Sequence, residues 1–261
     1  MLSSPNQAAG GLPASRSPTP HSAILLAVEA ASHPHYTHYT SDQIRRLDGF
    51  YGRVDARFNE RIATHVVGRR VLDFGSGFGS LVDHLKRSGF EATGIDLHES
   101  QVFAGRERFQ DLDLRIVTPG PLEFSDDEFD TVIFKDSLHH VAAEIDVDAA
   151  LNEVSRICSQ RLIIFEPNPS IPLKIGRTLI GHVDPTLPPD AARALVERTA
   201  FQVKSVQYLA SLAFPLSGGY VGKPLLPQQA PEGIFRLDER IVRLLGPGVA
   251  WRYLMVADKR P

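Results

Sequence analysis

The stretch VLDFGSGFGS, residues 71–80, decides the fold of this chain. A short apolar run, residues 71–74, leads into a segment with glycine at every second position, Gly75, Gly77 and Gly79. Apolar residues then recur at helical spacing, at Leu81, Val82 and Leu85. This pattern predicts a strand, a tight glycine turn and the start of a helix. Glycine permits positive φ and close approach to the backbone. A helix start offers free N–H groups, so the turn suits a ligand with an anionic group.

The spacing of the glycines separates two classes of ligand. The dinucleotide fingerprint requires G-x-G-x-x-G, but the sixth position counted from Gly75 is Ser80. The third glycine, Gly79, comes one residue early, and Asp73 stands two residues before the first. This arrangement resembles motif I, (D/E)-x-G-x-G-x-G, of the class I S-adenosylmethionine (SAM)-dependent methyltransferases.

Four later segments continue the resemblance in the order that this family uses. They are a second strand ending in an acid, a turn into a fourth strand, a Leu-His-His ending and a fifth strand. In this chain they read EATGID at 91–96, FSDDEFDTVIF at 124–134, KDSLHHV at 135–141 and RLIIFEP at 161–167. The resemblance covers roughly residues 36–208 and a last strand near the C-terminus.

Strands and helices alternate from residue 70 onward. Strands are expected at 70–74, 91–95, 114–117, 130–134 and 161–165, with helices near 79–88, 99–109 and 145–158. This alternation predicts an α/β fold with a parallel sheet and helices on both faces. A helix at 188–199, strands at 201–208 and 250–257, and a helix near 234–245 follow. The resemblance implies a Rossmann-like, seven-stranded, mostly parallel sheet whose antiparallel last strand lies between the fifth and sixth.

Ligands of such sheets bind at the carboxyl ends of the strands. Asp73, Asp96, Asp136 and Glu166 all fall at such ends, which predicts one shared pocket.

Composition divides the chain into three parts. Residues 1–20 are rich in Ser, Pro, Gly and Ala, which predicts a disordered tail. Residues 21–68 are expected to form an N-terminal helical cap, and residues 69–261 the SAM-binding methyltransferase domain. Two Pro-containing excursions, 167–187 and 209–249, are expected to be substrate lids, because long ordered loops at a pocket are usually functional.

The resemblance implies SAM as cofactor, S-adenosylhomocysteine as product and a set of binding residues. Asp96 would accept the ribose hydroxyls, and Leu97 would pack on the adenine or ribose. Asp73 would meet the amino group of the methionine part, or else only accept N–H groups of its own turn. Thr118 stands where the family often has an acid for the adenine, and Lys135 would offer its backbone carbonyl. The other expected contacts are Ser76, the glycines Gly75, Gly77 and Gly79, and Tyr36 and Tyr39.

Three residues are candidates for proton chemistry: His139, His140 and Glu166. Histidine titrates near neutrality and can take a proton from a substrate hydroxyl or an activated carbon. We expect at least one histidine to face the pocket, with His140 preferred, while the other only packs or bonds the backbone. Glu166 is a second candidate base or substrate anchor. Methyl transfer needs a base only where the nucleophile must lose a proton.

Composition excludes several classes of protein. A formal net charge of −3 gives no support for broad binding to nucleic acid. The single cysteine, Cys158, excludes an internal disulfide framework and a cysteine-rich zinc site, and its apolar helical context predicts a buried thiol in a reducing cytoplasm. The loop His33–His38 is a weak metal candidate without fixed geometry, so no metal is expected. No apolar run reaches the length of a membrane span.

These observations predict an enzyme that moves a methyl group from SAM to O, C or N of a small molecule. The apolar, Pro-rich lids indicate an acceptor with a sizeable apolar part: lipid-like, isoprenoid, aromatic or polyketide. A protein or nucleic-acid methyltransferase is one alternative, although the (N/D)-P-P-(Y/F) motif is absent after the fourth strand. A SAM-fold protein that does not methylate is another. The glycine spacing counts against a nicotinamide-linked dehydrogenase.

Overall fold

The computed structural model describes residues 44–180, 186–219 and 223–261. Tyr36, Tyr39, the loop His33–His38 and the expected tail lie outside these ranges, so the predictions for them stay predictions. The strands are β1 (Arg70–Phe74), β2 (Glu91–Asp96), β3 (Asp113–Ile116), β4 (Phe129–Lys135), β5 (Cys158–Pro167), β6 (Phe201–Leu209) and β7 (Arg252–Lys259).

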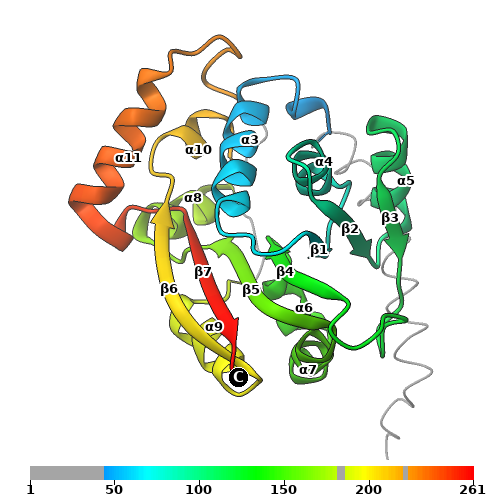
Figure 1. The fold of residues 1–261 in the computed structure, drawn as a ribbon. Helices are drawn as coiled ribbons and strands as arrows, with labels where there is room; N and C mark the ends of the chain where they lie inside the picture. The colour runs from blue at the N-terminus through cyan, green and yellow to red at the C-terminus, as the bar shows by residue number, and fades with distance from the viewer. Residues whose placement is uncertain (1–43, 181–185, 220–222) are drawn as a thin grey trace, which may run out of the picture.

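The seven strands form one sheet with the order β3-β2-β1-β4-β5-β7-β6 (Figure 1). β1 pairs in parallel with β2 and β4, and the pairs β2–β3 and β4–β5 are also parallel. β7 runs antiparallel between β5 and β6. The predicted seven-stranded sheet with an antiparallel last strand is therefore confirmed.

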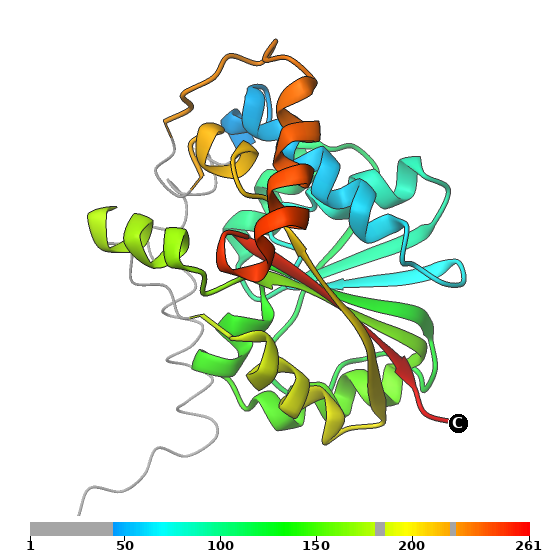
Figure 2. The same cartoon turned by 90° about the vertical axis from the view of Figure 1, so that its left-hand side faces the viewer.

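Helices surround the sheet on both faces (Figures 1 and 2). Those named here are α3 (Phe50–Ala63), α4 (Ser80–Arg87), α5 (Glu99–Arg108), α6 (Leu138–Glu144), α7 (Val147–Ile157), α8 (Ile171–Ile180), α9 (Pro189–Glu197), α10 (Ala213–Leu216) and α11 (Gly233–Leu245), with the 3-10 turn η1 (Gly246–Gly248).

Alternate residues of the central strands belong to two different cores. In β4, Val132 and Phe134 pack with residues of α6, α7 and α9, whereas Ile133 packs with residues of α3 and α4. The same alternation separates Leu72 from Val71 in β1. A strand with helices on both sides buries every residue, which explains why these strands read as continuous apolar runs.

Three local features differ from the sequence expectation. α6 was not expected, and the 167–187 excursion contains the helix α8. Cys158 does not lie in a helix: it is the first residue of β5, which begins three residues before the expected 161. The thiol is fully buried, as predicted, and burial raises its pKa.

The excursion between β6 and β7 packs against α3. Phe235 of α11 lies 5.6 Å, centroid to centroid, from Phe50 of α3. Asp238 of α11 caps α10, although the two helices are far apart in the sequence. Its Oδ1 accepts the N–H groups of Ser211 at 2.7 Å and Ala213 at 2.9 Å. α3, α10 and α11 therefore form one layer above the sheet edge (Figure 2).

Candidate active site

The glycine turn connects β1 to α4 at the carboxyl end of the sheet. Gly75, Gly77 and Gly79 have φ of +77°, +55° and +82°, in the left-handed region that favours glycine. The N–H groups of Gly75 and Ser76 donate to the carbonyl of Ile95 in β2, at 2.8 and 2.9 Å. The turn is therefore fixed to the neighbouring strand and leaves little room at Gly75.

A side chain at Gly75 would collide with the next element. A Cβ built there would lie 2.5 Å from the Cβ of Ser137. Ser137 cannot easily move, because its Oγ donates to the carbonyl of Phe74 at 2.6 Å. Glycine is thus required at position 75 because Ser137 fills the space that a Cβ would need.

Asp73 is an acid buried without a partner for one of its oxygens. Its side chain is 2% exposed, and its Oδ1 has no hydrogen-bond partner among the described residues. Burial raises the pKa of Asp73 to about 7, and Lys135 partly opposes that rise. The alternative in which Asp73 only accepts N–H groups of its turn has no such hydrogen bond to support it. An orphaned buried carboxylate oxygen fits a cationic ligand group.

Asp96, at the end of β2, is bonded to the turn itself. Its Oδ2 accepts the N–H of Gly77 at 2.7 Å, and its Oδ1 accepts the N–H of His98 at 2.8 Å. The His98 ring nitrogen Nδ1 lies 3.0 Å from the same Oδ1. A carboxylate offers about four lone-pair sites, so Asp96 keeps acceptor capacity for a ligand while it holds the turn.

The remaining expected cofactor contacts lie around this turn. Leu97 is half-buried directly after β2, and Thr118 is exposed in the loop that follows β3. The buried Oγ of Ser76 has no hydrogen-bond partner in the part of the chain that the structure describes. These expected contacts thus lie together at the carboxyl ends of β1, β2 and β3, but their roles stay predictions.

Lys135, the last residue of β4, belongs to an ion-pair cluster that sequence reasoning missed. Its Nζ donates to Asp55 Oδ1 and Asn59 Oδ1, both at 2.6 Å, and lies 3.3 Å from Ser80 Oγ. Asp55 and Asn59 are four residues apart on α3, so the available signal was a polar i, i+4 pair on an otherwise packed helix. The cluster ties α3 to the start of α4 beside the glycine turn.

Glu166 is fully buried in β5 and joins this strand to the start of α6 and to His139 in its first turn. Its Oε1 accepts the N–H groups of Ser137 at 3.1 Å and Leu138 at 2.7 Å, at the start of α6. Its Oε2 bonds Nδ1 of His139. Because Glu166 is fully buried, its contacts are with the start of α6 and with the ring of His139. The sequence does not predict the pairing of Glu166 with His139, because the two residues are far apart along the chain.

His139 and His140 have different surroundings. His139 is 4% exposed, and its ring centroid lies 4.2 Å from that of the half-buried His140. Burial alone would lower the pKa of His139, but the hydrogen bond and charge of Glu166 outweigh it and raise that pKa. Asp136, at φ +55°, and Arg252 approach the same group, 3.5 Å apart. The structure thus pairs His139 with a fixed carboxylate, and the choice between His139 and His140 as a base stays a prediction.

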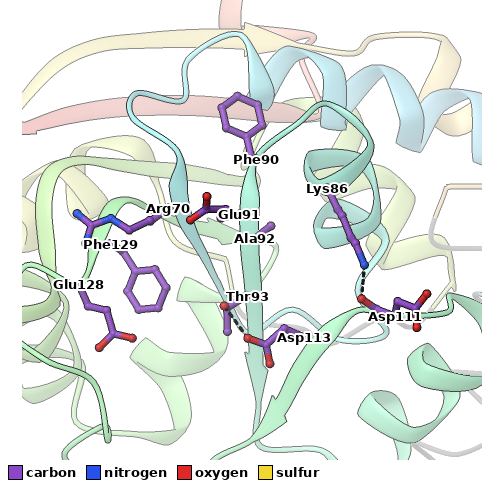
Figure 3. A pocket seen from close by; sticks show the side chains of 10 residues that line it. All are labelled: Arg70, Lys86, Phe90, Glu91, Ala92, Thr93, Asp111, Asp113, Glu128 and Phe129. Carbon is purple, nitrogen blue, oxygen red and sulfur yellow. Dashed lines mark hydrogen bonds between the residues drawn. The ribbon is translucent and has the colours of Figure 1, made fainter.

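A separate hollow of about 450 Å³ lies at the amino ends of β1, β2 and β3, opposite the glycine turn (Figure 3). Arg70, Glu91 and Asp113, the first residues of β1, β2 and β3, help to line it. It does not include the glycine turn or the histidines, so it is distinct from the candidate site.

Across the described ranges no group of three His, Cys, Asp or Glu side chains is arranged to hold a metal ion. No described helix is both long and apolar enough to cross a membrane.

Residues 72–164 match a family model described as a methyltransferase domain. A ubiquinone biosynthesis O-methyltransferase from Mesorhizobium japonicum is 27% identical over 143 residues, which are 52% of this chain and 56% of the relative. The chain thus spans about half the length of the curated relative that it matches.

Two solved structures show the same fold. A SAM-dependent methyltransferase from Thermotoga maritima superimposes with a TM-score of 0.60 at 15% identity, covering 86% of this chain and 98% of that one. The [4+2]-cyclase SpnF superimposes with a TM-score of 0.54 at 18% identity, covering 78% and 81%. These matches confirm the Rossmann-like fold.

Proposed function

We propose that the chain is a class I SAM-dependent methyltransferase that methylates a hydroxyl oxygen of a small molecule with a sizeable apolar part. The observation that carries the donor site is the buried, unpartnered Oδ1 of Asp73 beside the glycine turn. Bound SAM would supply an electrophilic methyl group on a sulfonium. Asp73 would hold its ammonium group, the turn at Gly75 and Gly77 would pack against its methionine part, and Asp96 would accept its ribose hydroxyls.

The paired histidine and carboxylate support a hydroxyl as the acceptor. A hydroxyl oxygen becomes a good nucleophile when a nearby base removes its proton. Nδ1 of His139 faces Glu166, which leaves Nε2 of the same ring as the proton acceptor. Glu166 of β5 then stabilises the resulting imidazolium while it keeps its hydrogen bonds to the start of α6. In this proposal His139, rather than the predicted His140, is the base.

An apolar acceptor agrees with the residues that cover the sheet edge. Phe214 lies 5.7 Å from Trp251, and both belong to a buried cluster shared by α3, α8, α10 and α11. The guanidinium of Arg252 lies 4.5 Å from the Phe214 ring centroid, next to the histidines. The two predicted lids, 167–187 and 209–249, contribute to this cluster. The matched relative is named for ubiquinone biosynthesis, which supports an aromatic acceptor with a hydroxyl group.

A SAM-fold protein that does not methylate is the second candidate. The similarity to a [4+2]-cyclase favours it over a nucleic-acid or protein methyltransferase. In that case the apolar cluster would shape a substrate, and the His139–Glu166 pair would not be needed for proton removal.

The test is calorimetric titration of the purified protein with SAM, S-adenosylhomocysteine and NADH. We expect binding of the two sulfur ligands and none of NADH. Phenolic acceptors with apolar tails are then screened with methyl-labelled SAM, and we expect label in the product ether. Binding without transfer to any acceptor would favour the non-methylating alternative. Absence of binding by either sulfur ligand would refute the proposed donor site.

A further inference from the structure

α11 exposes an apolar stripe on the side that faces away from the protein. Its inner face packs through Phe235 and Asp238, which are both buried. On the outer face Leu237 is 49% exposed and Leu244, seven residues and about two turns later, is 81% exposed. Leu245 adds a third leucine at 63%. Figure 1 shows α11 at the margin of the molecule, with its outer side away from the sheet.

Three arginines flank this apolar stripe. Arg236, Arg240 and Arg243 are all exposed, and their spacing of four and then three residues places them along the same outer face. None of the three makes an ion pair with another described residue, whereas Glu232, just before the helix, is already paired with Arg53.

The acids of α11 do not cancel this charge. Asp238 points inward, where it caps α10, and Glu239 is the only other acid in the helix. The outer face is therefore a mixed surface of leucines and arginines with positive net charge.

We propose that the outer face of α11 docks on a membrane surface that contains anionic lipids. A helix with leucines beside arginines can lie in the interface plane, with leucines among the acyl chains and arginines at the headgroups. Positive charge next to exposed leucine matches this surface better than it matches a second copy of the chain, whose α11 would repel it. The helix lies in the excursion between β6 and β7, beside the apolar cluster of Phe214 and Trp251. Docking would hold that cluster close to acceptors dissolved in the bilayer.

The experiment is flotation of the full chain with phosphatidylcholine vesicles, with and without phosphatidylglycerol, at low and high NaCl. It needs no cofactor or acceptor, so its result is independent of the proposed methyl transfer. We expect binding to the anionic vesicles only, and weaker binding at high salt. Each arginine near the surface contributes roughly a five-fold gain in binding, so R236E with R240E should lose well over ten-fold. L244E should lose binding even at low salt.

Two control variants carry changes of the same kind, an apolar side chain or an arginine replaced by Glu, on helices other than α11. F103E alters an apolar side chain that is 52% exposed on α5, and R87E alters an arginine whose side chain is 75% exposed on α4. Both controls should float as the unaltered chain does. Circular dichroism confirms that each variant is folded.

Three results would overturn the proposal. One is absence of the unaltered chain from anionic vesicles, and another is equal loss by the control and α11 variants. The third is a dimer in sedimentation velocity that L244E dissociates without any change in vesicle binding, since the outer face would then cover a second copy.

Discussion

Replacing Asp73 by Asn should stabilise the ligand-free protein and weaken its binding of SAM at the same time. Burial raises the pKa of this carboxyl from 3.8 to about 7 in the folded state. A tenfold change in an acid dissociation constant corresponds to about 1.4 kcal/mol, so ionised Asp73 costs the folded state roughly 4 kcal/mol. Asn has nearly the same shape and no charge, and it removes that cost.

The pH dependence gives this prediction its sign. Between about pH 4 and pH 7 the folded protein keeps a proton that the unfolded chain has lost, so the cost grows with pH and is complete above about pH 7. The difference in unfolding free energy between Asp73→Asn and the unaltered chain should be near zero at about pH 4. It should approach roughly 4 kcal/mol at about pH 8. Urea unfolding followed by circular dichroism across this range measures it.

Binding of SAM should show the opposite effect. If ionised Asp73 holds the ammonium group, affinity should rise several-fold from about pH 6 to about pH 7.5, as the ionised fraction of Asp73 rises and before the ligand's α-amino group loses its proton. Calorimetry at each pH should show that Asp73→Asn binds more weakly and has lost this dependence. A variant that is less stable than the unaltered chain at about pH 8, with SAM affinity intact, would refute the reasoning. Asp73 would then serve the turn alone.

Three further substitutions test other parts of the site. Gly75→Ala should abolish SAM binding and lower the free energy of unfolding more than Gly89→Ala does. Both glycines have positive φ, but only a Cβ at Gly75 meets a neighbour, at 2.5 Å. Gly89→Ala should cost about 1–2 kcal/mol in thermal unfolding, and an equal cost for both variants would argue against this steric role of Gly75. Glu166→Gln keeps an acceptor for the start of α6 but removes the charge that raises the pKa of His139. Turnover should therefore fall and its acidic limb should move to lower pH, with S-adenosylhomocysteine affinity unchanged; an unmoved limb would remove the histidine as the base. Lys135→Met leaves a buried carboxylate of α3 without its cation and should cost roughly 3 kcal/mol in chemical unfolding, whereas a loss below about 1 kcal/mol would mean that solvent screens the pair.

The elements that could be predicted from the sequence are those whose signal is local. β1, β2 and β4 are short buried runs, and the glycine spacing places the turn and α4 after β1. The antiparallel last strand was implied by the family resemblance rather than by any local pattern, and the structure confirms it.

The features that could not be predicted depend on residues far apart in the chain. α6 is only seven residues long, and although Ser137 stands at its N-cap, its first N–H groups are capped by Glu166 from β5 and not by the Ser137 side chain. The pairing of Glu166 with His139 also joins residues that are far apart in the sequence, so no local pattern predicts it. Lys135 likewise finds its partners on α3, 76 and 80 residues away.

The place of β7 in the sheet also sets the order in which the chain can be assembled on the ribosome. β6 ends at Leu209, and among the described strands it pairs only with β7, which begins at Arg252. During synthesis β6 therefore emerges with both edges unpaired, while β1 to β5 can already pair among themselves. The nascent chain carries an open strand until residues 252–259 insert between β5 and β6. Chaperone demand and aggregation during translation should therefore concentrate in this interval, and a stop codon before residue 252 should release a chain that aggregates through β6.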